Sequence, residues 1–256
     1  NPVPMNMIKT EIRKVLGTDL NTYIDKTKTL KITIYAPQGV EIAKRTFNPR
    51  LGIVGGISIL GTSGIVEPMS DEGWKKSLSI ELEMKRAQGL DKIILVPGNH
   101  GEEFIQNELR LDIKYVVRMS NFVGYMLMEA KRMGYKKILL AGHIGKFIKV
   151  SAGIFHTHSK VADARNEIMI SNLALMGAPL EFLQEIDKCV TAEGAVEIID
   201  QSEYTGVYEI LCNKCRDRVK QHLGDDDIEV GVYMFRMDKS YLAKSDNADS
   251  IVEVFR

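Results

Sequence analysis

KIILVPGNHG, residues 92–101, is the stretch that decides the fold. Its apolar run Ile93–Val96 predicts a buried strand, and the GNHG that follows predicts a loop. Residues 102–109 then have the composition of a helix. The same order of strand, loop and helix recurs at residues 112–133 and begins again at 136–146. This alternation predicts a parallel sheet with helical crossovers.

The residues before this repeat predict a smaller α+β domain, residues 1–69. The spacing of apolar residues ahead of Gly17 predicts a short helix. Segments 31–36 and 40–47 are rich in β-forming residues and flank Pro-Gln-Gly, so they predict an antiparallel hairpin. A glycine-rich crossing at residues 52–64 leads out of this domain.

Residues 70–256 are expected to form the larger domain, an α/β fold that is Rossmann-like, mostly parallel and three-layered. Ser70 is placed as the N-cap of its first helix, where Lys, Glu, Met and Arg favour a helix over a strand. A helical section is expected at about residues 160–223, and alternating apolar residues predict a final strand at 228–235.

The charges of the chain balance. Its 256 residues include 34 Lys and Arg against 34 Asp and Glu, so no nucleic-acid partner is expected. The uncharged stretch 51–66 is shorter than the roughly 20 residues of a membrane span and contains five glycines. We therefore expect a soluble protein with no membrane partner, and a homo-oligomer is left open.

The three cysteines do not suggest a disulfide framework, and no secretory segment precedes them. A reducing, cytoplasmic environment fits this pattern. Cys212 and Cys215 form an isolated CxxC, in which Cys215 continues an i+4 apolar stripe with Val207, Leu211 and Val219. Core packing explains this spacing better than a metal or redox site.

The run GGISILGTSG, Gly55–Gly64, nearly matches two phosphate-binding motifs. It lacks the Lys that a P-loop places before Ser or Thr, and the first Gly of GxGxxG. Neither a triphosphate nor a dinucleotide is expected here. Its tip, Thr62-Ser63 between glycines, can approach a ligand closely, and a purely structural hinge is the alternative.

Three loops should leave the carboxyl ends of the predicted strands: Gly98–Gly101, Ser120–Asn121 and Gly142–Lys146. In open parallel sheets, ligands bind at this edge, and glycines and helix N-termini suit a small polar ligand such as a nucleoside. His100 and His143 should approach one another there. They either face a ligand or only hydrogen-bond their own loops.

A local positive patch follows at residues 146–165. It comprises Lys146, Lys149, His156, His158, Lys160 and Arg165. His-Thr-His lacks an evident third metal ligand, so binding of carboxylates is the better interpretation. A solvated charged face is the alternative.

Two blocks, NPRLGIVGGISILGTSGIVEPMS at 48–70 and GHIGKFIKVSAGIFHTHSKVADAR at 142–165, closely resemble the most distinctive segments of the CbiD family. This is the family of cobalt-precorrin-5B C1-methyltransferases of anaerobic cobalamin (vitamin B12) biosynthesis. The similarity runs from Asn1 to the strand near Val232. The family begins upstream with a Gly- and Thr-rich segment, so this chain is expected to lack an N-terminal part.

The resemblance implies transfer of a methyl group from S-adenosylmethionine to C1 of a corrin precursor, giving cobalt-precorrin-6A. It also implies a two-domain α/β arrangement. Cobalt would arrive with the substrate, so no residue is assigned to a metal. A non-catalytic corrinoid or tetrapyrrole carrier is the alternative. A nucleotide-dependent oxidoreductase is disfavoured, because no intact GxGxxG follows a strand.

Within this hypothesis, each candidate residue receives a role. The residues expected to hold the methyl donor are Gly98, Asn99, His100, Ser120, Asn121 and Gly142. Those expected to hold the corrinoid substrate are Thr62, Ser63, Lys146, His156, Lys160 and Arg165. His143 or His158 would act as acid or base on the ring.

Overall fold

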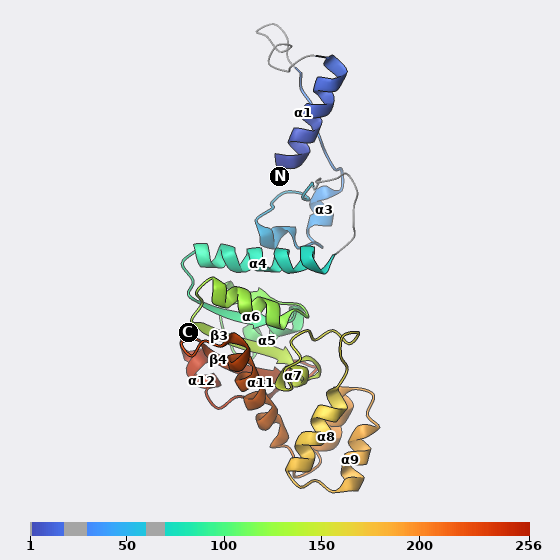
Figure 1. The fold of residues 1–256 in the computed structure, drawn as a ribbon, viewed down its shortest axis with the longest axis vertical. Coiled ribbons are helices and arrows are strands. Elements are labelled where there is room, and N and C mark those ends of the chain that lie inside the picture. Colours follow the sequence, from blue (N-terminus) through green and yellow to red (C-terminus); the bar gives the residue numbers. More distant parts are fainter. Residues whose placement is uncertain (1, 18–29, 60–69) are drawn as a thin grey trace. The chain divides into compact units, whose positions relative to one another are not determined.

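The computed structural model describes residues 2–17, 30–59 and 70–256, and it divides into two compact units, Asn1–Trp74 and Lys75–Arg256 (Figure 1). The domain division expected after residue 69 stays a prediction, since residues 60–69 lie outside the described residues.

In the first unit, α1 spans Pro2–Leu16. It ends at Gly17, whose φ of +64° lies in the left-handed region that glycine adopts at little cost. This helix and its stop confirm the prediction. A 3₁₀ helix, η1, spans Asn48–Leu51 and ends at Gly52 in the same left-handed conformation.

The predicted hairpin is wrong. Residues 30–36 have no regular secondary structure, and the second segment contains a short helix, α3, at Gly39–Ala43. A strand needs a hydrogen-bonded neighbour, and the described residues provide none for either segment. Gly39 and Ala43 are the buried residues of α3, at the i, i+4 spacing of one helical face.

In the second unit, five strands form one mixed sheet. They are β1 (Lys92–Val96), β2 (Val116–Arg118), β3 (Lys137–His143), β4 (Glu229–Phe235) and β5 (Tyr241–Lys244). Their order is β2-β1-β3-β4-β5, with β1 to β4 parallel and β5 antiparallel to β4. The mostly parallel α/β fold is thus confirmed.

Helices connect and cover these strands (Figure 1). They are α4 (Asp71–Ala87), α5 (Asn99–Asn107), α6 (Val123–Arg132), α7 (Ile144–Ser151), α8 (Arg165–Leu175), α9 (Leu180–Asp187), α10 (Ala192–Ile199), α11 (Val207–Leu223), α12 (Ala248–Glu253) and the 3₁₀ helix η2 (Ile113–Tyr115). The Ser70 hydroxyl accepts the Gly73 N–H at 3.1 Å, which confirms the predicted N-cap of α4. Helices α8 and α9 pack side by side.

Both faces of the sheet are buried. One face, with Ile94 of β1 and Leu139 of β3, forms a core with residues of α5 and α12, including Phe104 and Ile251. The alternate position Leu95 is fully buried as well. Each such side chain stabilises the fold by about 1.5–3 kcal/mol. This explains why these strands appear in the sequence as continuous apolar runs.

The CxxC is part of the core, as predicted. Cys212 and Cys215 on α11 are fully buried, together with Leu211 and Val219 of the same stripe. Burial raises the pKa of both thiols, so the unreactive protonated form is favoured.

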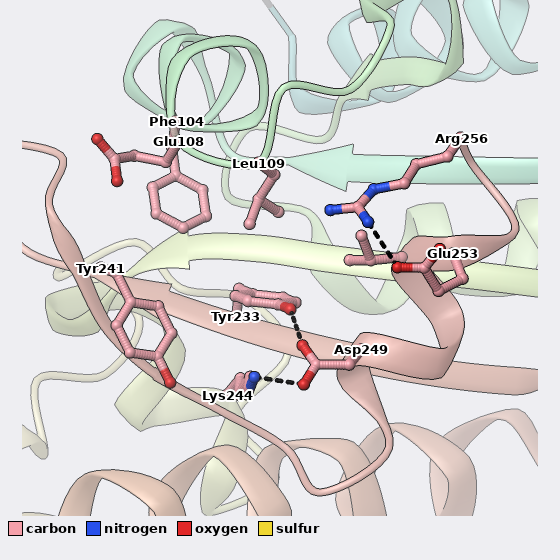
Figure 2. A pocket seen from close by; sticks show the side chains of 10 residues that line it. Phe104, Glu108, Leu109, Tyr233, Tyr241, Lys244, Asp249, Glu253 and Arg256 are labelled. Atoms are coloured by element: carbon pink, nitrogen blue, oxygen red, sulfur yellow. Dashed lines mark hydrogen bonds and ion pairs between the residues drawn. The ribbon is translucent and has the colours of Figure 1, made fainter.

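The sequence did not predict β5 and α12, and side-chain contacts tie them to β4. Figure 2 shows the Tyr233 hydroxyl donating to one oxygen of Asp249 on α12, at 2.7 Å, while Lys244 of β5 donates to the other, at 2.5 Å. One carboxylate therefore joins the two elements to β4.

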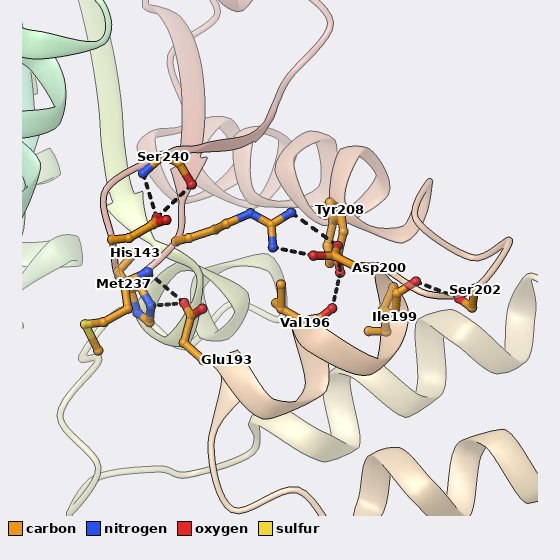
Figure 3. A network of polar contacts seen from close by, with 11 residues as sticks. His143, Glu193, Val196, Ile199, Asp200, Ser202, Tyr208, Met237 and Ser240 are labelled. Atoms are coloured by element: carbon orange, nitrogen blue, oxygen red, sulfur yellow. Dashed lines mark hydrogen bonds and ion pairs between the residues drawn. The ribbon is translucent and has the colours of Figure 1, made fainter.

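Helix α10 is attached to the segment after β4 by a second carboxylate. Asp200, the C-cap of α10, accepts hydrogen bonds from Arg236 at 2.5 and 3.2 Å and from the Tyr208 hydroxyl at 3.0 Å (Figure 3). The hydrogen bond from Arg236 is the main cause that lowers the pKa of Asp200, and the Tyr208 hydroxyl acts in the same direction.

Gly142 of β3 tests the packing at the carboxyl end of the sheet. A Cβ at this position would lie 2.2 Å from the ring of Phe147, which is fully buried. Gly142→Ala should therefore destabilise the protein by about 2 kcal/mol through overpacking, measured by urea unfolding. Gly98→Ala is the control, since a Cβ there meets nothing within 4 Å. Equal midpoints for the two variants would contradict this packing.

Asp200→Asn tests the attachment of α10. Because the pKa of folded Asp200 is lowered, its contribution is present above the unfolded value near 4 and lost as pH falls below it. The variant should lose about 1 kcal/mol at pH 7, and the difference from wild type should shrink between pH 4 and pH 2. Thermal unfolding across this range measures it, with exposed Asp226→Asn as the control. A deficit that does not depend on pH would refute the carboxylate's role.

Candidate functional site

The candidate site lies where the strand order reverses. The chain passes from β1 to β2 on one side and then returns to β3 on the other side of β1. Crossovers diverge at such a point and leave a crevice outside the carboxyl ends of the strands. A pocket of about 290 Å³ is found there. Its lining residues are Pro97, Gly98, Asn99, His100, Gly101, His143, Lys146 and Phe235.

The pocket contains residues that the sequence placed in different loops. Gly98, Asn99 and His100 follow β1, while His143 ends β3 and Lys146 lies in the first turn of α7. His100 and His143 share this pocket, as expected from strand ends meeting at one edge. Gly142, which precedes His143 on β3, is not among the lining residues.

The glycines have different surroundings. A Cβ on Gly101 would lie 2.6 Å from the Cβ of Val96, so this glycine allows α5 to pack closely on β1. Gly98 has an extended φ of 179°, and a Cβ there would meet nothing within 4 Å. Gly98 therefore leaves space open in the pocket without being required by the fold.

The loop after β2 joins the site through an amide. Lys146 Nζ donates to Asn121 Oδ1 at 2.9 Å, which links the pocket to this loop. Ser120 adopts a φ of +53°, a left-handed conformation that is uncommon for residues other than glycine. The three predicted loops are thus brought together, with Lys146 between them.

Lys146 is largely removed from solvent. Burial lowers the pKa of its ammonium group, and the nearby charge of Lys149 adds to this effect. Its charged form is therefore less favoured than that of an exposed lysine.

His143 has both ring nitrogens engaged. Nδ1 accepts the Gly145 N–H at 3.1 Å, so His143 is the N-cap of α7. Nε2 lies 2.6 Å from Glu193 Oε1, and the same oxygen accepts the Met237 N–H at 2.9 Å (Figure 3). His143 is thus held between α7 and α10.

The His156–His158 segment is attached to the loop after β2. His156 forms an isolated bridge with Phe122, and their rings meet edge to face at 5.1 Å. The Thr157 N–H donates to the Asn121 carbonyl at 3.0 Å. His158 Nδ1 accepts the Lys160 N–H at 3.1 Å. These contacts place the histidines next to the loop that Lys146 also contacts.

Two further residues of the positive patch, Lys149 and Arg165, have partners within the protein. Lys149 is 3% exposed and donates to the carbonyls of Thr157, at 3.1 Å, and Ala162, at 2.9 Å. Arg165 forms a two-bond pair with Asp163, at 2.6 and 2.9 Å. Lys160 is exposed. Fewer charges of the patch are therefore available to a ligand than the sequence suggests.

Two predicted site residues lie outside the described part of the chain, and two residues at the site were not predicted from the sequence. Thr62 and Ser63 lie outside the described residues. Sequence reasoning missed Phe235, which pairs with His143 across β3 and β4, and Glu193, which reaches His143 from α10. Thr191 two residues earlier signals a helix start around Glu193, but no local pattern points from there to His143.

A larger cavity, about 540 Å³, lies beside β4, β5 and α12 and contains none of the predicted site residues. Its Tyr233 and Lys244 both donate to Asp249, and its Arg256 donates to Glu253 (Figure 2). In the described part of the chain, no group of three or more His, Cys, Asp or Glu could hold a metal ion. None of the described helices has the length and apolarity needed to cross a bilayer.

Comparison with known proteins gives consistent matches. The family model described as CbiD matches residues 1–68, and that described as CbiD, C-terminal domain, matches residues 156–246. Over 257 residues, the chain is 70% identical to the cobalt-precorrin-5B C(1)-methyltransferase of Clostridioides difficile (strain 630). This match covers 100% of the chain but only 63% of that relative.

The chain covers a slightly larger share of two other relatives. The chain is 52% identical over 258 residues to the protein of the same name from Listeria monocytogenes (strain EGD-e), covering 100% of the chain and 67% of the relative. For Photorhabdus laumondii the identity is 47% over 257 residues, with 100% and 68% covered. No solved structure matches the chain. Identity at this level along the whole chain, together with the two family-model matches, shows that the chain belongs to the CbiD family.

Proposed function

We propose that this chain forms the methyl-donor site and part of the substrate site of a cobalt-precorrin-5B C1-methyltransferase. The reaction would use S-adenosylmethionine and give cobalt-precorrin-6A in cytoplasmic, anaerobic cobalamin biosynthesis. The names of the relatives support the reaction, and the pocket at the strand-order reversal supports the donor site. In this proposal the second unit is a Rossmann-like three-layer domain, joined near residue 70 to a smaller domain.

The donor site is proposed at the three loops around Lys146. A volume of about 290 Å³ is at the lower end of the range for small-molecule sites, about 300–1,000 Å³, and suits a nucleoside-sized group. Gly98, Asn99 and His100 at the start of α5 would contact the donor directly. Ser120, Asn121 and Gly142 would shape the site from the neighbouring strand ends.

Positioning is the main catalytic task. S-adenosylmethionine, when bound, supplies a methyl group activated by its sulfonium, so no covalent nucleophile is required. The protein has to hold the donor and the corrin carbon in line, which removes much of the entropic cost of the reaction. The attachment of the His156–His158 segment to Asn121 fits this task, because it connects the proposed substrate side to the donor side.

The substrate side is proposed around this segment. Corrin precursors carry several carboxylates, which His156 and exposed Lys160 would bind by charge-assisted hydrogen bonds. Arg165 would contribute if it exchanges its bond to Asp163 for one to substrate, and Lys146 is the further candidate in this unit. Thr62 and Ser63, outside the described residues, stay candidates from the sequence alone. Of the two proposed acid–base residues, we favour His158. Its Nε2 has no hydrogen-bond partner among the described residues, whereas both ring nitrogens of His143 are engaged.

Gly98 offers a direct test of the donor site. Gly98→Val should fill the pocket and weaken binding of S-adenosylhomocysteine, measured by isothermal titration calorimetry, by about tenfold or more. Gly98→Ala should have a smaller effect, and unfolding midpoints should be unchanged in both. Full affinity in the valine variant would refute this location, and a corrinoid-binding protein with no affinity for S-adenosylhomocysteine would support the carrier alternative.

Lys160 and His158 test the substrate side through different kinetic constants. Lys160→Ala should raise KM for cobalt-precorrin-5B by about threefold with kcat unchanged, as expected for an exposed charge. His158→Ala should lower kcat by about a hundredfold, since it removes acid–base catalysis. The assay follows labelled methyl transfer in this chain and in a version extended to the length of the relatives.

Lys188→Ala is the matched control, because Lys188 is exposed and lies outside the proposed site. Equal KM values for the two lysine variants would exclude Lys160 from substrate binding, and a normal kcat for His158→Ala would exclude its catalytic role.

A further inference from the structure

We infer that Glu193 is a positioning residue that holds His143 in one neutral tautomer and thereby fixes the wall of the pocket. This inference rests on the proposed function only where it concerns donor binding. Glu193 belongs to α10, a helix that contributes no residue to the pocket lining.

The tautomer follows from the two partners of His143. A backbone N–H can only donate, so Nδ1 must be the unprotonated acceptor of the 3.1 Å bond from Gly145. The proton of the neutral ring is then on Nε2, which donates to Glu193 Oε1 over 2.6 Å. The His143 and Glu193 side chains are only 19% and 25% exposed, so water competes weakly for this bond.

Glu193 is itself fixed from two sides. The Thr191 hydroxyl accepts the Gly194 N–H at 3.1 Å and caps α10, so the carboxylate lies in the first turn, where the helix dipole favours negative charge. The Met237 N–H donates to the same Oε1 at 2.9 Å. Figure 3 shows this oxygen between the imidazole and the Met237 backbone.

The consequence for the pocket is geometric. His143 caps α7, the helix that carries Lys146, and its ring lies 6.2 Å from that of Phe235, another lining residue. A Cβ on Gly145 would lie 3.1 Å from the His143 ring and 3.6 Å from Ala192 of α10, so the junction is closely packed. If the bond to Glu193 is removed, only the Gly145 N–H still favours this tautomer, and the Nδ1–H form becomes populated. Rings protonated at Nδ1 cannot cap α7.

The test is nitrogen NMR of the His143 ring, with S-adenosylhomocysteine titration as a second readout. Glu193→Ala should convert the single Nε2–H tautomer into a mixture and weaken S-adenosylhomocysteine binding about tenfold, the effect of one charge-assisted hydrogen bond. Glu193→Gln keeps an oxygen acceptor, so it should restore the tautomer and bring the affinity within about threefold of wild type. Glu197→Ala, an exposed residue of the same helix, is the control and should change neither.

A wild-type tautomer in Glu193→Ala would overturn the inference, and so would Glu193→Gln behaving like the alanine variant. If the wild-type chain binds no S-adenosylhomocysteine, the proposed donor site fails. The tautomer measurement still decides the role of Glu193 in that case.

Discussion

The pairing of β1 with both β2 and β3 is the constraint on which the candidate site depends. Because β1 lies between them and all three are parallel, their carboxyl ends meet at one edge. The loops that follow are far apart in sequence but must lie close together. The chain adds β2 on one side of β1 and then β3 on the other side. The crossovers therefore diverge there and leave the crevice that contains the pocket. Apolar burial on both faces of the sheet holds this edge in place.

Helix α7 and its N-cap connect this edge of the sheet to several surrounding segments. Within two turns, His143 caps the helix and contacts Glu193, Lys146 contacts Asn121, and Lys149 binds the carbonyls of the 157–162 segment. Within the positive patch, Lys146 and Lys149 therefore have separate structural contacts, and only part of the patch is available to a ligand. Burying a lysine costs free energy of folding unless its ammonium group is hydrogen-bonded. The bonds of Lys149 to two carbonyls are therefore needed for stability, and its charge is not available to a ligand.

Local sequence patterns predicted the features that depend on residues close together in the sequence. Ile93–Val96 and the Cys215 stripe were predicted correctly because each apolar pattern reflects the burial of its own residues, and the cap at Ser70 because it is a hydrogen bond within one helical turn. The hairpin at 31–47 failed because strand pairing is non-local, and β-forming residues without a neighbouring strand in the described chain do not pair. The three site loops were foreseen from strand topology. Glu193 was not, because its contact with His143 spans 50 positions and depends on how α10 packs.

The central claim is that the methyl donor binds at the carboxyl ends of β1 and β3, where the strand order reverses. Hydrogen–deuterium exchange with and without S-adenosylhomocysteine tests it most directly, because it locates binding on the whole chain without any substitution. The account predicts protection of backbone amides at 98–101, 120–121 and 142–146. Protection confined to the larger cavity around Tyr233 and Tyr241, with none at these loops, would contradict it.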